Sequence, residues 1–234
     1  VFVGALPVTP STYRFSGSNS QYCKFPPWGS VQNAHERSIL SFQFRTSREN
    51  SFLVYLDDGG RSSYIYISLQ NRTVRLRYKF GESAPAVLTG GLNLNDNRWH
   101  VISVERKYPS ITLLVDGQSL AGKVKVKSNS DLVTGSFTYI GSLPKTYRIQ
   151  TLSFPIAFYE EKFVGSVRQV AINGKFVRTI AKLQVQEVPG NQLCSETRNP
   201  CKNNGACFVR GEKQACDCSS TMFKGKFCES CESL

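Results

Sequence analysis

Short runs in which apolar and polar residues alternate, separated by turn-forming pairs, constrain the fold more than any other feature of this sequence. The runs at 38–46 ("SILSFQFRT") and 73–80 ("TVRLRYKF") are typical examples. Alternate side chains of an extended strand point to opposite faces, so each run predicts a strand with one buried face. Asp-Gly at 116–117 and Asn-Gly at 173–174 predict hairpins, because both pairs tolerate the positive φ angles of tight turns.

β-branched and aromatic residues dominate these runs, whereas helical periodicity is scarce. The other runs that predict strands cover residues 51–56, 63–69, 99–107, 110–116, 122–127, 136–143, 165–173 and 175–180. We expect a helical turn or two near 155–162, and an irregular entry with one strand over residues 1–35. So many short strands predict an all-β protein, namely an antiparallel sandwich, a jelly roll or a barrel.

Seven of the eight cysteines lie between Cys194 and Cys231, and six of these follow the spacing C-x6-C-x5-C-x8-C-x-C-x9-C. Such density predicts a small disulfide-stapled module in an oxidising, secreted environment. Zinc is disfavoured because this part of the chain contains no histidine. The Pro-Gly pair at 189–190 is typical of a hinge, so we expect two domains, residues 1–190 and residues 191–234.

The positive charge is concentrated in the larger domain. Residues 1–190 hold 23 of the 29 basic residues and 12 of the 17 acidic ones. Two strands carry cations at alternate positions, and these form two candidate glycan-binding rows: Arg75, Arg77 and Lys79, and Lys123, Lys125 and Lys127. If both rows share one sheet face, their summed field favours a sulfated glycan such as heparan sulfate. The alternative is the ordinary polar face of half-buried strands.

The sequence argues against an enzyme and against a nucleic-acid partner. It contains no Gly-x-Ser-x-Gly elbow, no phosphate-binding loop and no His-Glu-x-x-His motif. Of the two histidines, His100 follows Trp99 at a predicted strand start, where a hydrogen-bonded structural role is expected. Nucleic acid is disfavoured because the cysteine module predicts an extracellular location. No apolar run is long enough to span a membrane and no signal peptide opens the chain, so we expect a fragment of a longer mature protein.

The cysteine module resembles an EGF-like domain. The segments "NPCKNNGAC" and "CDCSSTMFKGKFC" carry this resemblance, because they combine the six-cysteine spacing with glycines at tight turns. The resemblance implies three disulfides: Cys194–Cys207, Cys201–Cys216 and Cys218–Cys228. Cys23 and Cys231 remain, and we consider a long-range bridge between them, a free Cys23, or partners elsewhere in a longer chain.

Residues 38–178 resemble a laminin G (LNS) domain. The segments that carry this resemblance are Trp99-His100, Leu-Val-Asp-Gly at 114–117, Ile140-Gly141 and Phe163-Val164-Gly165. The resemblance implies a curved jelly-roll sandwich of two antiparallel sheets. An LNS domain followed by an EGF-like domain is similar to the start of the α-neurexin ectodomain. Agrin, perlecan, slit and contactin-associated proteins share the same pair of domains and stay open as alternatives.

The neurexin resemblance implies a non-catalytic fragment of a synaptic cell-adhesion receptor. Its parent would be a membrane-anchored glycoprotein on the outer, presynaptic cell surface. The implied partners are extracellular adhesion proteins, together with heparan sulfate as a candidate ligand. The alternatives are a matrix-type glycan-binding module and a passive spacer.

We expect no metal and no cofactor, although many LNS domains bind calcium at their loop rim. In the family, an acidic ligand precedes the aromatic residue that opens one strand, and here that position is Ser63. A second ligand position falls at 131–134, where only Asp131 is acidic, and the carbonyl-donating position lies near Lys79. Separately, Asn71-Arg72-Thr73 is a glycosylation sequon in a predicted hairpin turn, so Asn71 is the candidate glycosylation site.

Overall fold

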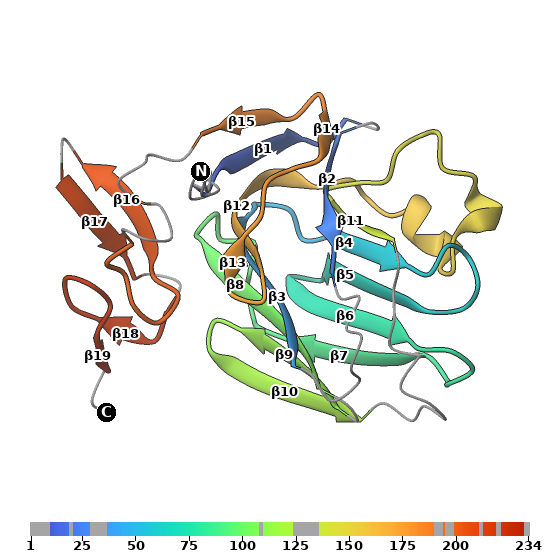
Figure 1. The fold of residues 1–234 in the computed structure, drawn as a ribbon, viewed down its shortest axis with the longest axis horizontal. Coiled ribbons are helices and arrows are strands. Elements are labelled where there is room, and N and C mark those ends of the chain that lie inside the picture. The colour runs from blue at the N-terminus through green and yellow to red at the C-terminus, as the bar shows by residue number, and fades with distance from the viewer. Residues whose placement is uncertain are drawn as a thin grey trace, which may run out of the picture.

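The larger part of the chain is a sandwich of two antiparallel sheets, which confirms the predicted all-β fold (Figure 1). The computed structural model describes residues 10–18, 21–28, 37–107, 110–123, 136–189, 194, 199–210, 213–218 and 221–231, without the side chains of residues 123 and 208–210. One sheet has eight strands in the order β10-β9-β8-β3-β12-β1-β15, with β13 paired to β12. The other has seven, in the order β14-β2-β11-β4-β5-β6-β7.

The strands of the eight-stranded sheet are β1 (Thr12–Ser16), β3 (Ser38–Arg45), β8 (His100–Lys107), β9 (Ser110–Val115), β10 (Gln118–Lys123), β12 (Val164–Ile172), β13 (Lys175–Phe176) and β15 (Gln186–Val188). Those of the seven-stranded sheet are β2 (Tyr22–Pro27), β4 (Ser51–Asp57), β5 (Tyr64–Gln70), β6 (Thr73–Lys79), β7 (Ala86–Gly90), β11 (Phe137–Ile140) and β14 (Ala181–Leu183). The predicted hairpins are confirmed, because Asp116 and Asn173 have φ angles of 48° and 52° at their turns.

The main core lies between the two sheets and follows the alternation in the sequence. Leu40, Phe42 and Phe44 of β3 are at most 1% exposed, and Ile65 and Ile67 of β5 face them from the other sheet. Burying an aliphatic or aromatic side chain of this size stabilises the fold by roughly 2 kcal/mol. This face of each strand is the one that the alternating pattern predicts.

A second apolar cluster, which the alternation does not predict, covers the outer face of the seven-stranded sheet. Tyr64 and Tyr66 of β5 point away from the main core and pack with Tyr55, Leu152 and other residues. The segment between β11 and β12 lies over them and contains two short 3-10 helices, η2 (Ile149–Thr151) and η3 (Pro155–Phe158). Strands β4 and β5 are therefore buried on both faces, and the predicted helical turn near 155–162 is confirmed.

The entry of the chain differs from the prediction of one strand in an irregular segment. It contains two strands, β1 and β2, which belong to different sheets (Figure 1). Phe15 of β1 and Phe25 of β2 are buried in the main core. Each strand is only five or six residues long, so its alternation is too brief to stand out among the surrounding Ser, Pro and Gly. At the other end, the strand predicted over 175–180 is limited to Lys175–Phe176.

The cysteine module contains two small hairpins, β16 (Ala206–Arg210) with β17 (Lys213–Asp217), and β18 (Phe223–Lys224) with β19 (Ser230–Cys231). Three disulfides join Cys194 to Cys207, Cys201 to Cys216, and Cys218 to Cys228. These are the pairs that the EGF-like resemblance implies.

The bridge considered between Cys23 and Cys231 is absent, since both residues are free thiols. Cys23 lies in β2 with no exposed surface, whereas Cys231 is exposed on β19 of the module. Burial raises the pKa of the Cys23 thiol far above its ordinary value, which keeps it protonated. Packing inside the sandwich therefore protects Cys23, and no disulfide is needed for that purpose.

Candidate functional site

The cationic row on β6 points outward as predicted, but neighbouring side chains hold two of its three members. Arg75 Nη1 and Arg77 Nη2 each donate to Gln70 Oε1 over 3.0 Å. Arg77 Nη1 also lies 3.6 Å from Glu160 Oε1, which comes from the segment over the outer apolar cluster. This row is therefore half-buried and partly neutralised, and glycan binding by Arg75, Arg77 and Lys79 stays a prediction.

Lys123, the one described member of the lysine row, lies in a different sheet from the β6 row. Lys123 is the last residue of β10, at the edge of the eight-stranded sheet, whereas β6 belongs to the seven-stranded sheet. Lys125 and Lys127 lie outside the described residues. Lys123 and the β6 row therefore belong to different sheets, and the summed field of the two whole rows stays a prediction, because alternation shows a strand's faces but not its sheet.

The calcium position implied by the laminin G resemblance is occupied by a hydrogen-bonded serine. Ser63 is 4% exposed, and its Oγ accepts a bond from the Gly81 amide over 2.9 Å. The nearby Asp58 carboxylate accepts from the Ser63 amide and from Ser153 Oγ, both over 2.8 Å. Burial opposes ionisation of Asp58, but these hydrogen bonds outweigh it and lower its pKa. Asp131 lies outside the described residues, so the absence of a calcium site stays a prediction.

Asn71 occupies the exposed turn between β5 and β6, in a left-handed conformation with φ of 51°. Its amide donates to Asn50 Oδ1 over 3.0 Å, and Thr73 Oγ1 of the sequon donates to the Gln70 carbonyl over 2.8 Å. An oligosaccharide at this turn would extend into solvent without crossing the core. Occupancy of Asn71 stays a prediction.

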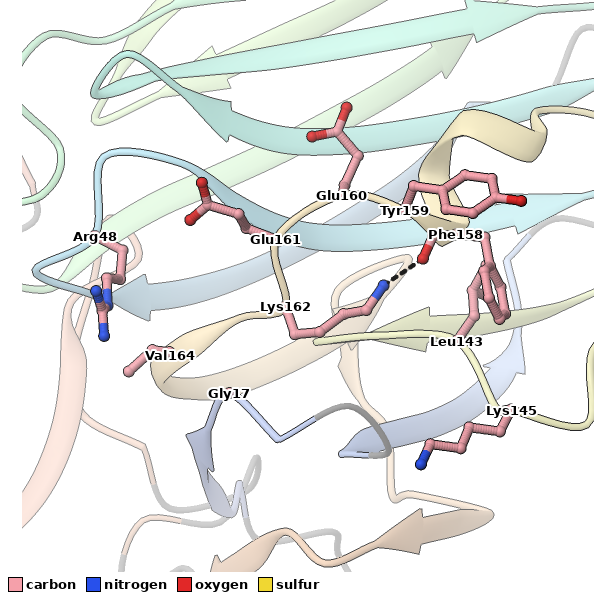
Figure 2. Close-up of a pocket in the computed structure, with 10 residues that line it drawn as sticks. All are labelled: Gly17, Arg48, Leu143, Lys145, Phe158, Tyr159, Glu160, Glu161, Lys162 and Val164. Atoms are coloured by element: carbon pink, nitrogen blue, oxygen red, sulfur yellow. Dashed lines mark hydrogen bonds between the residues drawn. The ribbon is translucent and has the colours of Figure 1, made fainter.

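A hollow of about 780 Å³ lies at the base of the segment over the outer apolar cluster (Figure 2). Leu143 and Val164 contribute apolar surface, while Arg48, Lys145 and Glu161 contribute exposed charges of both signs. The Lys162 ammonium donates to the Phe158 carbonyl over 2.5 Å, as Figure 2 shows, so it closes its own loop. The residues that line the hollow come from several distant parts of the chain, so no single sequence motif predicts it.

His100 has the hydrogen-bonded structural role that the sequence predicts. Its Nδ1 lies 2.8 Å from Asp116 Oδ2 and its Nε2 lies 2.9 Å from Asp96 Oδ1. Burial alone would lower the pKa of the imidazole, but hydrogen bonds and charge from Asp116 and Asp96 outweigh burial and raise it. The ring ties the turn before β8 to the turn after β9.

This arrangement predicts a pH dependence for the stability that His100 contributes. The raised folded-state pKa means that the contribution is complete below the unfolded pKa of about 6.5 and is lost as pH rises through the folded value. The lowered pKa of Asp96 keeps that carboxylate ionised throughout this range. In urea unfolding between pH 6 and 9, the native chain should have a higher free energy of unfolding than a His100→Gln variant at pH 6. This difference should shrink as pH rises. Parallel curves for the two proteins would contradict this assignment.

The cysteine module contacts the outer face of the eight-stranded sheet. Gln43 of β3 donates from Nε2 to the Asn204 carbonyl over 3.1 Å, and accepts at Oε1 from Arg168 Nε over 2.7 Å. Arg168 Nη2 reaches Asp217 of β17 at 3.3 Å. Gln43 is only 2% exposed. Charge-assisted and buried polar contacts of this kind fix the orientation of the module relative to the sandwich.

Trp99 stands beside this contact between two arginines. The guanidinium carbons of Arg168 and Arg45 lie 3.9 and 5.0 Å from the ring centroid. Burial lowers the pKa of Arg168 to about 10, even though Asp217 favours its charged form, and the charge of Arg45 adds to the decrease. Trp99 belongs to a segment that carries the laminin G resemblance, but the sequence does not predict that Arg45 and Arg168 contact its ring.

Comparison with known sequences places these features in a family context. A family model described as Laminin G domain matches residues 44–175. Neurexin-2 of Homo sapiens is 30% identical over 225 residues, which are 96% of this chain and 13% of the relative. Neurexin-2 of Mus musculus is 30% identical over 216 residues, 92% of this chain and 12% of the relative. The chain thus spans only a small part of the length of the curated relatives that it matches.

Solved structures show the same sandwich. Domains LG4-5 of the mouse laminin α1 chain superpose with a TM-score of 0.64 and 19% identity, covering 76% of this chain and 46% of that one. The LG1-3 region of the laminin α2 chain gives a TM-score of 0.59 and 18% identity, over 76% and 34% of the two chains. At such identities the likeness concerns the fold alone. None of the helices in the described ranges has the length and apolarity that crossing a membrane requires.

Proposed function

Because this chain belongs to the laminin G domain family, we propose that it is the adhesion module of a neurexin-like receptor at the outer cell surface. The observation that carries the proposal is the 30% identity to neurexin-2, which extends over the sandwich and the cysteine module together. Three disulfides in so small a module fit an oxidising, extracellular environment. The module has the spacing of an EGF-like domain, and the parent protein is membrane-anchored and presynaptic in this proposal.

The chain works by binding and not by catalysis. Two groups that could serve catalysis are committed to structure: His100 bridges two carboxylates and the Cys23 thiol is buried and protonated. The contact through Gln43 and Arg168 holds the module against the sandwich, which fixes the direction in which a following domain would continue. A fixed direction suits a receptor that must present binding surfaces to partners on another cell.

Protein partners are proposed as the principal ligands, with heparan sulfate as a second class of ligand. Partner binding is expected to be independent of calcium, because Ser63 stands at the acidic ligand position and the Asp58 oxygens are occupied by hydrogen bonds. The positive charge of the sandwich favours anionic glycans by screened long-range attraction.

Binding of the tagged chain to living neurons tests this proposal. We expect saturable binding that mild protease treatment of the cells removes, that EDTA leaves unchanged, and that heparinase reduces only in part. Loss of all binding on heparinase treatment alone would favour the matrix-type glycan-binding module instead. Absence of saturable binding to any neuronal surface would contradict the adhesion function and favour a spacer. Loss of binding in EDTA would contradict the calcium-independent mechanism.

A further inference from the structure

The outer face of the eight-stranded sheet brings together two arginines that are far apart in the sequence. Arg14 of β1 pairs with Ser166 of β12, and Ser166 pairs on its other side with Arg45 of β3. Directly opposed residues of antiparallel strands point to the same face. With strands just under 5 Å apart, the Arg14 and Arg45 backbones are about 10 Å apart and Ser166 lies between them.

These residues line a cleft of about 480 Å³, which is separate from the two predicted cationic rows. Besides the two arginines, its polar lining consists of Thr46, Ser47, Asn97 and Ser166. Gly165 forms part of the floor, and a Cβ at this position would lie 2.2 Å from the Arg45 carbonyl oxygen. The missing side chain lets β12 approach β3 closely at the base of the cleft.

Positive charge on this face exceeds the negative charge that the structure places beside it. Arg168 shares the face, two residues after Ser166 on β12, and is paired with Asp217 of the module. Within the described ranges, none of the ion pairs includes Arg14 or Arg45. Arg45 stacks on Trp99, which fixes its guanidinium group without neutralising it. Among the residues that the structure describes, two cations therefore line a polar cleft without a paired carboxylate.

The chemistry of the lining favours an acidic saccharide over a protein partner. Planar guanidinium groups bind sulfate and carboxylate oxygens through paired hydrogen bonds, and hydroxyl and amide groups suit the hydroxyls of a sugar. Protein interfaces instead need an apolar or aromatic anchor at their centre. The lining includes none of the large apolar side chains that are exposed among the described residues; of its own apolar residues, Phe15 is only 5% exposed and Val164 is half-buried.

We infer that the cleft between Arg14 and Arg45 binds the sulfate or carboxylate group of an acidic saccharide. This inference rests on the glycan part of the proposed function and gives it a site that neither predicted row supplies. Ser166 and Asn97 are positioned to contact the saccharide's hydroxyl groups, and the cysteine module, held by Arg168, borders the same face.

Isothermal titration with a heparin-derived hexasaccharide tests the assignment on the full 234-residue chain. An Arg14→Gln/Arg45→Gln double variant should bind roughly a hundredfold more weakly than the native chain, since each of the two lost charge-assisted contacts costs about tenfold in affinity. A Lys107→Gln/Lys175→Gln variant removes the same net charge at exposed positions and should stay within about twofold of the native value. Equal weakening in both variants would show diffuse attraction and overturn the site.

Titrations with two other ligands separate the ligand classes. A hyaluronan hexasaccharide, which carries carboxylates without sulfate, identifies which oxyanion the same arginines bind. A decaglutamate peptide that binds as tightly as the saccharides through these arginines would overturn the choice of a saccharide. The single Arg14→Gln variant guards against misfolding, because Arg14 is exposed and should lose affinity without a change in thermal unfolding. Retained binding to neurons with no saccharide affinity would overturn only this inference and leave the adhesion function standing.

Discussion

A Gly165→Ala variant is expected to lose about 3 kcal/mol of unfolding free energy, because strain and overpacking act together at this position. Gly165 has a φ of +146°, which L side chains rarely adopt. An added Cβ would lie 2.2 Å from the Arg45 carbonyl oxygen and 2.9 Å from Phe163 Cζ. The first contact is to backbone, so relief requires β12 to move away from β3 and would also distort the cleft beside it.

Urea unfolding with the disulfides intact measures this loss, and Gly174→Ala is the matched control. Gly174 also has a positive φ, of +78°, but an added Cβ would have no neighbour within 4 Å. The control should therefore lose only the conformational part, about 1 kcal/mol. Equal losses for the two variants would contradict the role given to the close approach of β12 and β3.

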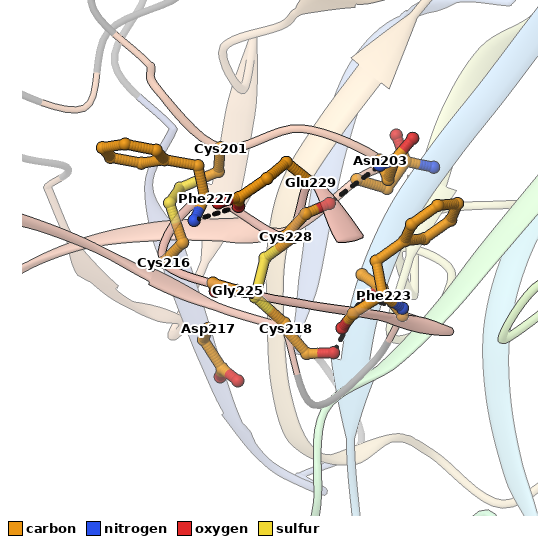
Figure 3. The surroundings of a disulfide bond; sticks show 12 residues. Cys201, Asn203, Cys216, Asp217, Cys218, Phe223, Gly225, Phe227, Cys228 and Glu229 are labelled. Carbon is orange, nitrogen blue, oxygen red and sulfur yellow. Dashed lines mark hydrogen bonds between the residues drawn. A yellow bond between two sulfur atoms is a disulfide. The ribbon is translucent and has the colours of Figure 1, made fainter. Parts of the chain in front are cut away.

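Removing one disulfide of the module is expected to have the second large effect. A Cys201→Ser/Cys216→Ser variant should lose about 3 kcal/mol of module stability, since the bond closes a loop of 15 residues in a unit with almost no apolar core. Figure 3 shows this bond close to the Cys218–Cys228 bond, with Asn203 Nδ2 donating to the Cys228 carbonyl over 2.8 Å. Loss of order here would also release the Asp217 contact with Arg168.

Amide hydrogen exchange distinguishes loss of the module from loss of the whole fold. Amides of β16 and β17 should exchange much faster in the variant, while those of β3 and β5 should keep their protection, because none of the described module residues belongs to the main core. Cys231→Ser is the control and should change neither region, since Cys231 is a free, exposed thiol. Unchanged exchange in β16 and β17 of the double variant would contradict the proposed dependence on the bond.

Local features of the chain were predictable because each depends on neighbours in the sequence. The alternation in 38–46 and 73–80 showed which side chains face the core, and Asp116 and Asn173 marked their turns. The cysteine spacing indicated a disulfide module, and the position of His100 beside Trp99 indicated a structural histidine. Even here length mattered, since β1 was too short for the alternation around Arg14 to be recognised as a strand.

Contacts between distant segments were decided by the tertiary structure alone. Alternation shows that a strand has two faces, but the pairing of strands decides which residues share a surface, and this placed Lys123 and the arginine row on different sheets. Arg77 forms an ion pair with Glu160, which lies 83 positions later in the segment over the outer apolar cluster. The same pairing joined positions 14, 166 and 45 into one cleft. The sequence by itself determined the β-strands, their buried faces and the cysteine module, because these depend on local periodicity and spacing. Only the pairing of strands distant in the sequence decided where Arg14 and Arg45 meet at the surface, because that pairing depends on contacts across the whole fold.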